Sequence, residues 1–326
     1  MTGVESRTKV FVAGATGVLG KRAVRRLIEA GHDVTGVVRS DAKAKLLEGL
    51  GATPAHVDLF DADAVRAAVA GHDVVCNLAT RIPPTAHAAR SGAWADNDRI
   101  RREASRHLVD GALATGARRF VQESITFLYA DAGERWIDED DPVDAPAFTR
   151  STLEAQAQAE RFTATGGTGV VLRFALFYGP DSHHTLDAVR LARRHLAATF
   201  GRRDAYLSAI TTDDAATAVV AALGAAAGVY NVADDEPLTR RDHFDALARA
   251  LGVRALRFAP AVARKVGGSK TEMLARSQRV SNERFKQATG WAPAYPSAHE
   301  GWPAVVAAIE SGAGRCVTGS CGCCWR

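Results

Sequence analysis

Hydrophobic and polar positions in the first half of the chain alternate between short β-branched runs and longer segments of helical periodicity. The run KVFVAG (9–14) predicts a buried strand, and the segment 18–30 places Leu19, Val24 and Leu27 on one face of a helix. Further strands are expected at 33–38, 53–57, 73–79, 118–124 and 169–174, and further helices near 41–50, 61–70, 97–115 and 148–165. Strands and helices that alternate in this way are typical of a parallel sheet covered by helices.

The pattern becomes less regular beyond residue 175. The segment 205–223 predicts a strand, a turn and a helix capped by Asp213 or Asp214, and the run 228–234 predicts another strand. Helical segments are expected near 240–251, 281–288 and 301–310. Since the chain contains neither a repeat nor a low-complexity linker, we expect one compact body with a smaller C-terminal lobe built from non-contiguous pieces.

Composition and charge narrow the classes of partner. The 326 residues include 47% hydrophobic and 24% charged residues, and the net charge is +4. These values are ordinary for a globular protein and favour neither nucleic acid nor a membrane surface as a partner. The N-terminal stretch lacks the apolar segment of a signal peptide, and the longest apolar run, 215–230, is too short to span a bilayer. We therefore expect a cytoplasmic location.

The cysteines are unevenly distributed. Cys76 lies alone in a strand-like run, while the other four crowd the tail CVTGSCGCCWR. A disulfide scaffold is not expected in a cytosolic protein of this size. The tail spacing matches no zinc motif and no histidine is near in sequence, so no metal site is predicted. We interpret residues 313–326 as a disordered or incidental tail, with binding of a soft metal as the alternative.

The motif GATGVLG lies between the first strand and the first helix. Glycines at this spacing allow a tight turn, let the backbone approach a pyrophosphate and pack the helix close to the sheet. The start of the helix then offers free N–H groups and the positive end of its dipole to the phosphates. A purely structural glycine turn is the competing interpretation. The residues expected to bind a dinucleotide here are Gly14, Thr16, Gly17, Val18, Leu19 and Gly20.

The end of the second predicted strand indicates which dinucleotide is bound. Arg39 and Ser40 stand where NAD-binding proteins carry a carboxylate for the ribose 2′-OH, and an arginine suits a 2′-phosphate. Lys21 and Arg22 follow closely behind the glycines. We therefore expect NADP, with NAD as the second choice; a merely exposed arginine is the alternative.

The ends of the third and fourth predicted strands supply further residues of the cofactor groove. Asp58 and Leu59 are placed to border the adenine. Leu78, Ala79 and Thr80 are placed to line the groove. A simple turn at each strand end is the alternative for both sets.

Several motifs together resemble a known family, the extended short-chain dehydrogenase/reductases of the NAD(P)-dependent epimerase/dehydratase group. They are GATGVLG, VDL (57–59), NLAT (77–80), ITTDDAATAVVAAL and GVYNVADDEPLT. The resemblance covers residues 8–310. It implies a Rossmann-type doubly wound α/β domain over 8–175 with parts of 205–234, and a substrate lobe over 176–204 and 235–312. It also implies a nicotinamide cofactor, with Phe177 and Tyr178 of LRFALFYGP near the nicotinamide end of the groove.

The catalytic set of that family is altered here. The resemblance implies a Ser or Thr after the fifth strand and a Tyr-x-x-x-Lys on the next helix, where tyrosine transfers a proton and lysine lowers its pKa. This chain places Phe148 in the tyrosine position and Thr152 in the lysine position, and neither can do that work. Ile125 falls in the hydroxyl position, flanked by Ser124 and Thr126, so that a shift of one residue restores either.

Other side chains could replace the missing acid or bind the substrate. Tyr129 and Tyr178 belong to turns expected to face the groove, although a tyrosine packed on its loop is the alternative for each. His183 and His184 follow in a predicted loop, where a histidine would be a competent acid near neutral pH, or would simply face solvent. Arg81 could bind an anionic group of the substrate or reach into solvent.

Three functions remain open from the sequence. The first is an NADP-dependent reductase that acts on a small organic metabolite with a non-standard proton donor. The second is an isomerase, dehydratase or cyclase of the same fold without net redox chemistry. The third is a non-catalytic nucleotide-binding sensor or scaffold, since fold alone does not fix function. A homodimer is compatible with each.

Overall fold

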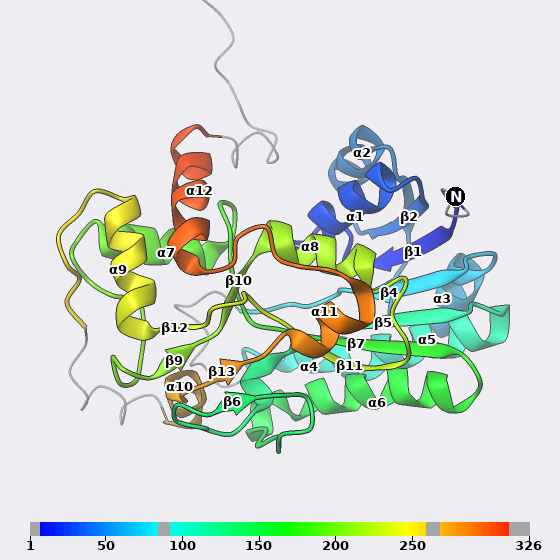
Figure 1. Ribbon diagram of the computed structural model, residues 1–326. Coiled ribbons are helices and arrows are strands. Elements are labelled where there is room, and N and C mark those ends of the chain that lie inside the picture. Colours follow the sequence, from blue (N-terminus) through cyan, green and yellow to red (C-terminus); the bar gives the residue numbers. More distant parts are fainter. Residues whose placement is uncertain (1–6, 84–91, 259–267, 313–326) are drawn as a thin grey trace, which may run out of the picture.

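A parallel β-sheet forms the centre of the protein (Figure 1). The computed structural model describes residues 7–83, 92–258 and 268–312. Among these residues, seven strands pair in the order β11-β7-β5-β4-β1-β2-β3. They are β1 (Lys9–Ala13), β2 (Asp33–Val38), β3 (Thr53–His56), β4 (Val74–Asn77), β5 (Arg119–Ile125), β7 (Thr168–Phe174) and β11 (Gly228–Val232). The predicted doubly wound fold is thereby confirmed, and the strand order reverses between β1 and β4.

Helices cover both faces of the sheet. One layer contains α1 (Gly20–Glu29), α2 (Asp41–Leu50), α8 (Thr212–Ala221) and α11 (Glu283–Thr289); the other contains α3 (Ala62–Val69), α5 (Ser105–Thr115) and α6 (Arg150–Ala164). Strand β1 shows why two layers are needed. Val10 and Val12 enter the core under the first layer, while Phe11 and Ala13 enter the core under the second. Because successive side chains point to opposite faces, a strand covered on both sides is a continuous hydrophobic run.

Shorter strands and further helices, most of them from the C-terminal half of the chain, lie beside the central sheet. Three two-stranded pairs occur there: β8 (Leu176–Tyr178) with β10 (Ala209–Thr211), β9 (Tyr206–Leu207) with β12 (Leu238–Thr239), and β6 (Trp136–Ile137) with β13 (Arg279–Val280). The helices are α7 (His183–Ala192), α9 (Arg240–Ala250), α10 (Gly268–Ala275) and α12 (Ala298–Glu310). A third core that includes Phe244, Leu247 and Trp302 joins α7, α9 and α12, which lie together at the left of Figure 1. The boundaries of a substrate lobe stay a prediction.

Two helix starts test the predicted caps. The Asp61 carboxylate accepts hydrogen bonds from the N–H groups of Asp63 and Ala64, as expected of an N-cap. Helix α8, however, is capped by Thr211 and not by Asp213 or Asp214. The Thr211 hydroxyl accepts from the Asp214 N–H at 3.0 Å, which leaves the two carboxylates inside the first turn.

The helix predicted at 97–115 is continuous but not uniform. It begins as α4 (Ala95–Arg99), passes through a π-helical turn at Ile100–Ala104 and continues as α5. A π-helical turn inside an α-helix is rare and is often found at a functional site. Here it carries the residues that face the start of α6.

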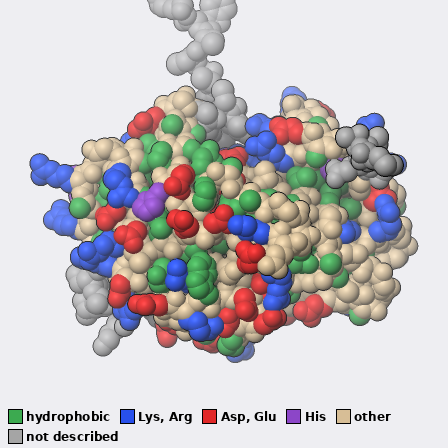
Figure 2. Space-filling view, viewed as in Figure 1, with side chains coloured by type: hydrophobic (Ala, Val, Ile, Leu, Met, Phe, Trp, Pro, Cys, Tyr) green, Lys and Arg blue, Asp and Glu red, His purple; other side chains and the backbone are tan. Residues whose placement is uncertain are grey.

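The surface shows no dominance of one charge sign on the side drawn in Figure 2, where acidic and basic side chains are interspersed. No helix in the described part of the chain is long and apolar enough to cross a membrane. Cys76 is fully buried in β4, and burial raises the pKa of its thiol to about 12. The cysteine-rich tail predicted at 313–326 lies outside the described residues.

Candidate nucleotide-binding groove and active site

The glycine loop between β1 and α1 packs directly against neighbouring backbone. Gly14 has φ +79°, and a Cβ there would lie 2.5 Å from the carbonyl oxygen of Leu78, at the end of β4. A Cβ on Gly20 would overlap the carbonyl of Gly14. Both positions therefore require glycine, because the loop packs directly on backbone.

The same loop also leaves hydrogen-bond donors free. The Gly17 N–H donates to the Gly14 carbonyl at 3.0 Å, which closes the turn. Within the described part of the chain, the N–H groups of Val18 and Leu19 donate to no acceptor. These donors stand at the first turn of α1, where the helix dipole also favours an anion. The loop thus offers the donors that a pyrophosphate accepts.

Arg39 and Ser40 lie at the carboxyl end of β2, next to the glycine loop in the sheet order. Both are exposed, and no hydrogen bond or ion pair joins the Arg39 guanidinium to another described residue. Ser40 caps α2 by its backbone geometry alone and leaves its hydroxyl free. An unpaired arginine beside a free hydroxyl fits a 2′-phosphate.

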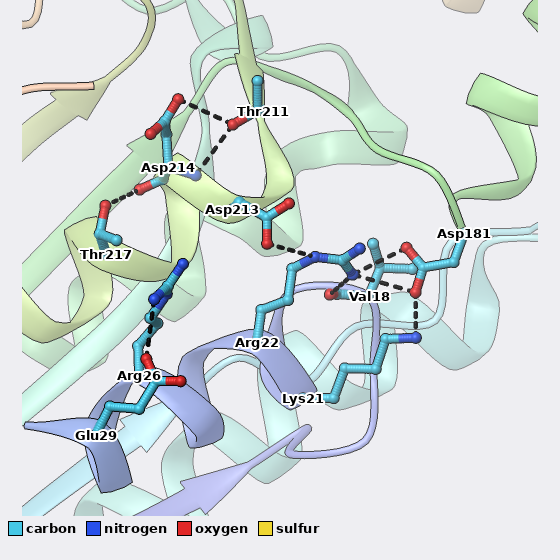
Figure 3. Close-up of polar contacts among 10 residues, drawn as sticks. All are labelled: Val18, Lys21, Arg22, Arg26, Glu29, Asp181, Thr211, Asp213, Asp214 and Thr217. Carbon is cyan, nitrogen blue, oxygen red and sulfur yellow. Dashed lines mark hydrogen bonds and ion pairs between the residues drawn. The ribbon is translucent and has the colours of Figure 1, made fainter. Parts of the chain in front are cut away.

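Unlike Arg39, Lys21 and Arg22 form ion pairs within the protein (Figure 3). Both form ion pairs with Asp181, which follows β8, and the Arg22 contact measures 2.9 Å. Arg22 also pairs with Asp213 of α8 at 3.2 Å and donates to the Val18 carbonyl at 3.0 Å. These cations therefore tie the glycine loop to the segment after β8, and Arg39 is the better candidate for the 2′-phosphate.

The remaining predicted groove residues lie at the ends of β3 and β4. The Asp58 carboxylate accepts from the Phe60 N–H at 3.0 Å, and the Leu59 carbonyl accepts from Nδ1 of His107 at 3.0 Å. Leu78 and Ala79 are buried, while Thr80 is exposed. Their positions at the carboxyl edge of the sheet agree with a cofactor groove, since ligands of open α/β sheets bind at that edge.

Phe148 and Thr152 lie in the turn and helix that follow the acidic loop. Phe148 belongs to a 3-10 turn (Ala147–Thr149) just before α6, is half-buried, and its ring lies 5.6 Å from that of Trp94. Thr152 lies in the first turn of α6 and is fully buried. The Thr152 hydroxyl accepts a hydrogen bond from the guanidinium of Arg101.

Arg101 therefore brings a buried cation to the position where the resemblance implies a lysine. Its guanidinium also pairs with Glu123 of β5 at 3.4 Å, and both side chains are buried. Burial raises the pKa of the Glu123 carboxyl, and the neighbouring Arg101 opposes that rise. Arg101 lies in the π-helical turn, so its position depends on the interrupted helix.

The two hydroxyl candidates at the end of β5 are both buried. The Ser124 hydroxyl accepts from Nε2 of Gln156 at 2.5 Å, and Gln156 accepts from Arg173 at 2.9 Å. Thr126 begins the 3-10 turn after β5 and is 1% exposed. Ser124 is therefore held in a polar network on the α6 side of the sheet, and its role toward a substrate stays a prediction.

Tyr129 and Tyr178, which the sequence predicts to face the groove, both have buried side chains, and their place in the site stays a prediction. The Tyr129 hydroxyl donates to Asn231 at 2.8 Å and accepts from Arg173 at 2.8 Å. The Tyr178 hydroxyl contacts Asp234 at 3.4 Å, and its ring packs on Trp302. Burial raises the pKa of each phenol. We do not propose either tyrosine as a proton donor, since each already bonds inside the protein.

His183 and His184 do not lie in a loop but form the first turn of α7. Both residues are exposed, and His184 contacts the carbonyl of Phe177 through Nε2. Phe177 is half-buried against Phe174, with ring centroids 5.2 Å apart.

Arg81 is exposed and pairs with Asp96 at 3.3 Å. It lies just after β4, so its position near the groove agrees with the prediction, while its role stays a prediction.

Sequence reasoning missed Arg101, Glu123 and Asn97. The run NDRIRRE resembles an ordinary solvated stretch of helix. Helical spacing carried a signal, because Asn97, Arg101 and Leu108 recur on one face at steps of four and seven residues. Asn97 and Arg101 are 0% and 3% exposed. Polar residues that share a helix face with apolar ones are expected to be buried, and this spacing could have predicted the burial of Asn97 and Arg101.

Among the described residues, no three His, Cys, Asp or Glu side chains lie close enough together to hold a metal ion. The candidates for binding a ligand in the groove are the free N–H groups, Arg39, and the buried pair of Arg101 and Glu123.

Comparisons with known proteins agree with this geometry. The sequence profile of the NAD dependent epimerase/dehydratase family matches residues 10–233. A Streptomyces protein named 3-diazoavenalumate denitrifying reductase is 35% identical over 311 residues, which cover 90% of this chain and 98% of that protein. The 2-alkyl-3-oxoalkanoate reductase of Shewanella oneidensis is 30% identical over 254 residues, 70% of this chain and 62% of that protein.

Solved structures share the fold at lower identity. A human epimerase family protein with NADPH has a TM-score of 0.77 at 22% identity and covers 92% of this chain and 99% of its own. The UDP-glucose 4-epimerase of Thermotoga maritima, with UDP-glucose, has a TM-score of 0.74 at 20% identity and covers 93% and 99%. At these identities the likeness establishes the fold alone.

Proposed function

The chain belongs to the NAD dependent epimerase/dehydratase family, and we propose that it is an NADPH-dependent reductase of a diazo-bearing organic acid. Reduction is the activity named for both relatives described above. The reaction of the first relative, as its name states, removes nitrogen from a diazo compound. This proposal is narrower than the family, whose fold also carries epimerases.

The cofactor part of the proposal rests on the glycine loop and on Arg39. The free N–H groups of Val18 and Leu19 supply donors for the pyrophosphate, and the unpaired Arg39 supplies a charge for the 2′-phosphate. The human structure of the same fold binds NADPH. NAD is the second choice, because Arg39 also tolerates a free ribose hydroxyl.

The observation that carries the proposal is the absence of a placed proton donor where the resemblance implies one. Phe148 and Thr152 replace the usual pair, and the hydroxyls of Tyr129 and Tyr178 are engaged in the interior. Reduction of a carbonyl consumes one hydride and one proton, so it needs such a donor. None of these four described side chains offers a free donor, which favours a reaction that takes up no proton.

A diazonium ion removes that requirement, whereas a neutral diazo carbon would still take up one proton, so the diazonium form is the substrate that we propose. NADPH, when bound, supplies the hydride. Reduction of a diazonium ion by a hydride forms one C–H bond, breaks the C–N bond and releases N₂, and the two electrons of the hydride cancel the positive charge of the substrate. No proton is taken up or released. The missing tyrosine and lysine are then explained by the reaction itself.

The aromatic pair of Phe148 and Trp94 supports a cationic substrate. Both rings are half-buried near the start of α6, and they lie tilted toward one another. Aromatic faces attract cations, so an apolar aromatic wall suits a diazonium group better than it suits a neutral carbonyl. The names of both relatives also describe carboxylates, which indicates an organic acid as substrate.

The test uses 4-carboxybenzenediazonium as the probe, because aryl diazonium ions survive long enough in water for an assay. We expect the purified protein to accelerate loss of NADPH absorbance, to release N₂ and to form benzoate. With NADPH deuterated at the transferred position, the deuterium should appear on the ring carbon. Reactions without protein, and with the glycine-loop variant Gly20→Ala, measure the uncatalysed background.

Two results would contradict the proposal. The first is a rate equal to the background, together with reduction of a 3-oxoalkanoate, which would make the protein a carbonyl reductase with a proton donor at another position. The second is the lack of any thermal stabilisation by NADPH or NADH, which would remove every cofactor-dependent function.

A further inference from the structure

Two buried side chains on one face of the interrupted helix have nitrogen atoms without an acceptor. Asn97 is 0% and Arg101 is 3% exposed. Nδ2 of Asn97 and Nε of Arg101 meet no hydrogen-bond partner within the described residues. Buried donors are normally satisfied, so these two, one helical turn apart, are available to hydrogen-bond a ligand.

The other polar atoms of these side chains are already fixed. The Asn97 carbonyl accepts from the Arg81 N–H at 2.9 Å, just after β4. The terminal nitrogens of Arg101 donate to Thr152 on α6 and to Glu123 on β5. The two open nitrogens are therefore held between the carboxyl ends of β4 and β5 and the start of α6, at the edge of the sheet where ligands bind.

The chemistry of the open donors selects the ligand. A guanidinium Nε–H and an amide N–H both donate, and neither accepts. A group with two acceptor oxygens and a negative charge satisfies both, and charge-assisted bonds of this kind are the strong ones. The ion pair with Glu123 holds the Arg101 side chain in place. Burial raises the pKa of the Glu123 carboxyl, so its ionised form neutralises the arginine less completely.

We propose that Asn97 and Arg101 bind the carboxylate of the substrate. This inference rests on the proposed function, in which the substrate is an organic acid. It adds the residues that select the acid over its uncharged derivatives. Phe148 and Trp94, which lie on the neighbouring turns, would then face the part of the substrate that carries the diazonium group.

The test compares 4-carboxybenzenediazonium with its methyl ester in the full-length protein with NADPH. We expect Arg101→Met to raise KM for the acid about tenfold to a hundredfold, the size of a charged hydrogen bond, and to leave KM for the ester unchanged. Arg101→Lys, which keeps the charge but not the fork of donors, should lie between. Asn97→Ala should show a smaller effect of the same kind.

Arg102→Met is the matched control. Arg102 is the next residue, exposed and paired with Glu154 at 2.9 Å, so its loss should change neither KM. Thermal stabilisation by NADPH must be retained in each variant, which shows that the fold and the cofactor site are intact. If wild-type protein treats acid and ester alike, or if Arg101→Met and Arg101→Lys change both KM values equally, the assignment is overturned.

Failure of the proposed function gives a different signature. If no diazonium ion is reduced, binding of benzoate and of benzamide to the protein saturated with NADP⁺ is measured by calorimetry. Binding of benzoate alone, lost in Arg101→Met and kept in Arg102→Met, supports the carboxylate site without the reaction. Equal or absent binding of the two ligands overturns it.

Discussion

The guanidinium of Arg101 donates a hydrogen bond to the hydroxyl of Thr152 inside the protein. The resemblance implies a lysine at residue 152, and the chain has threonine there. The positive charge is still present, but it comes from another helix and is fixed by Glu123. The segment FTRST therefore contacts a buried cation that belongs to a different helix.

The first prediction concerns Thr152→Lys. This change places a second cation beside Arg101 at a fully buried position, so we expect it to lower the free energy of unfolding by about 3 kcal/mol. The same change in an Arg101→Met background should recover much of that loss, because the introduced ammonium group can then pair with Glu123. Urea unfolding of the four proteins in the cycle gives the coupling. Equal losses in both backgrounds would mean that the two side chains do not meet.

The second prediction concerns the choice of cofactor. Arg39→Ala should weaken NADPH binding about tenfold to a hundredfold and leave NADH binding nearly unchanged, because the charged hydrogen bonds to the 2′-phosphate are lost. Isothermal calorimetry with both cofactors measures the difference. Arg106→Ala, at an exposed position on α5, is the control. A parallel loss for NADH would show that Arg39 supports the fold of the site and does not recognise the phosphate.

The third prediction concerns the glycine loop. A methyl group on Gly20 would overlap the Gly14 carbonyl, so Gly20→Ala must move the loop and should abolish thermal stabilisation by NADPH. Gly49→Ala in α2 meets no atom within 4 Å and should leave binding intact, with stability unchanged or raised by about 0.5–1 kcal/mol. Circular dichroism verifies the fold of both variants. Wild-type affinity in Gly20→Ala would contradict the assigned phosphate site.

The fourth prediction concerns pH. His243 in α9 is buried and accepts from Nε1 of Trp302 at 3.2 Å, and burial, aided by Arg240, lowers its pKa to about 3. The unfolded chain binds this proton near pH 6.5, so stability is full above that pH and falls as the pH drops toward 3, by up to about 1.4 kcal/mol per unit.

Measurement of the free energy of unfolding at pH 7.5 and at pH 5 checks the fourth prediction. His243→Gln can keep an acceptor for Trp302 without titrating, so it should lose less stability between these values than the wild type. His183→Gln, at an exposed position, should behave like the wild type. An identical pH slope in His243→Gln would assign the acid sensitivity to other groups.

The sequence by itself determined the parts of this protein that depend on neighbours along the chain. The strand β1 and the glycine turn after it follow from a short hydrophobic run and from glycines at positions where a larger side chain would overlap the backbone. The exposed Arg39 follows from its place at a strand end. These features are local, so periodicity and turn chemistry are enough to predict them.

Tertiary structure decided which distant side chains meet. Tyr129 donates a hydrogen bond to Asn231, 102 residues away, and Arg22 pairs with Asp181, 159 residues away. A local sequence pattern therefore predicts neither the burial of the tyrosine nor the ion pair of the arginine. Arg101 reaches Thr152 across 51 residues, because the π-helical turn and α6 pack together. Burial and charge pairing are properties of the packed interior, and they set the chemistry of the site.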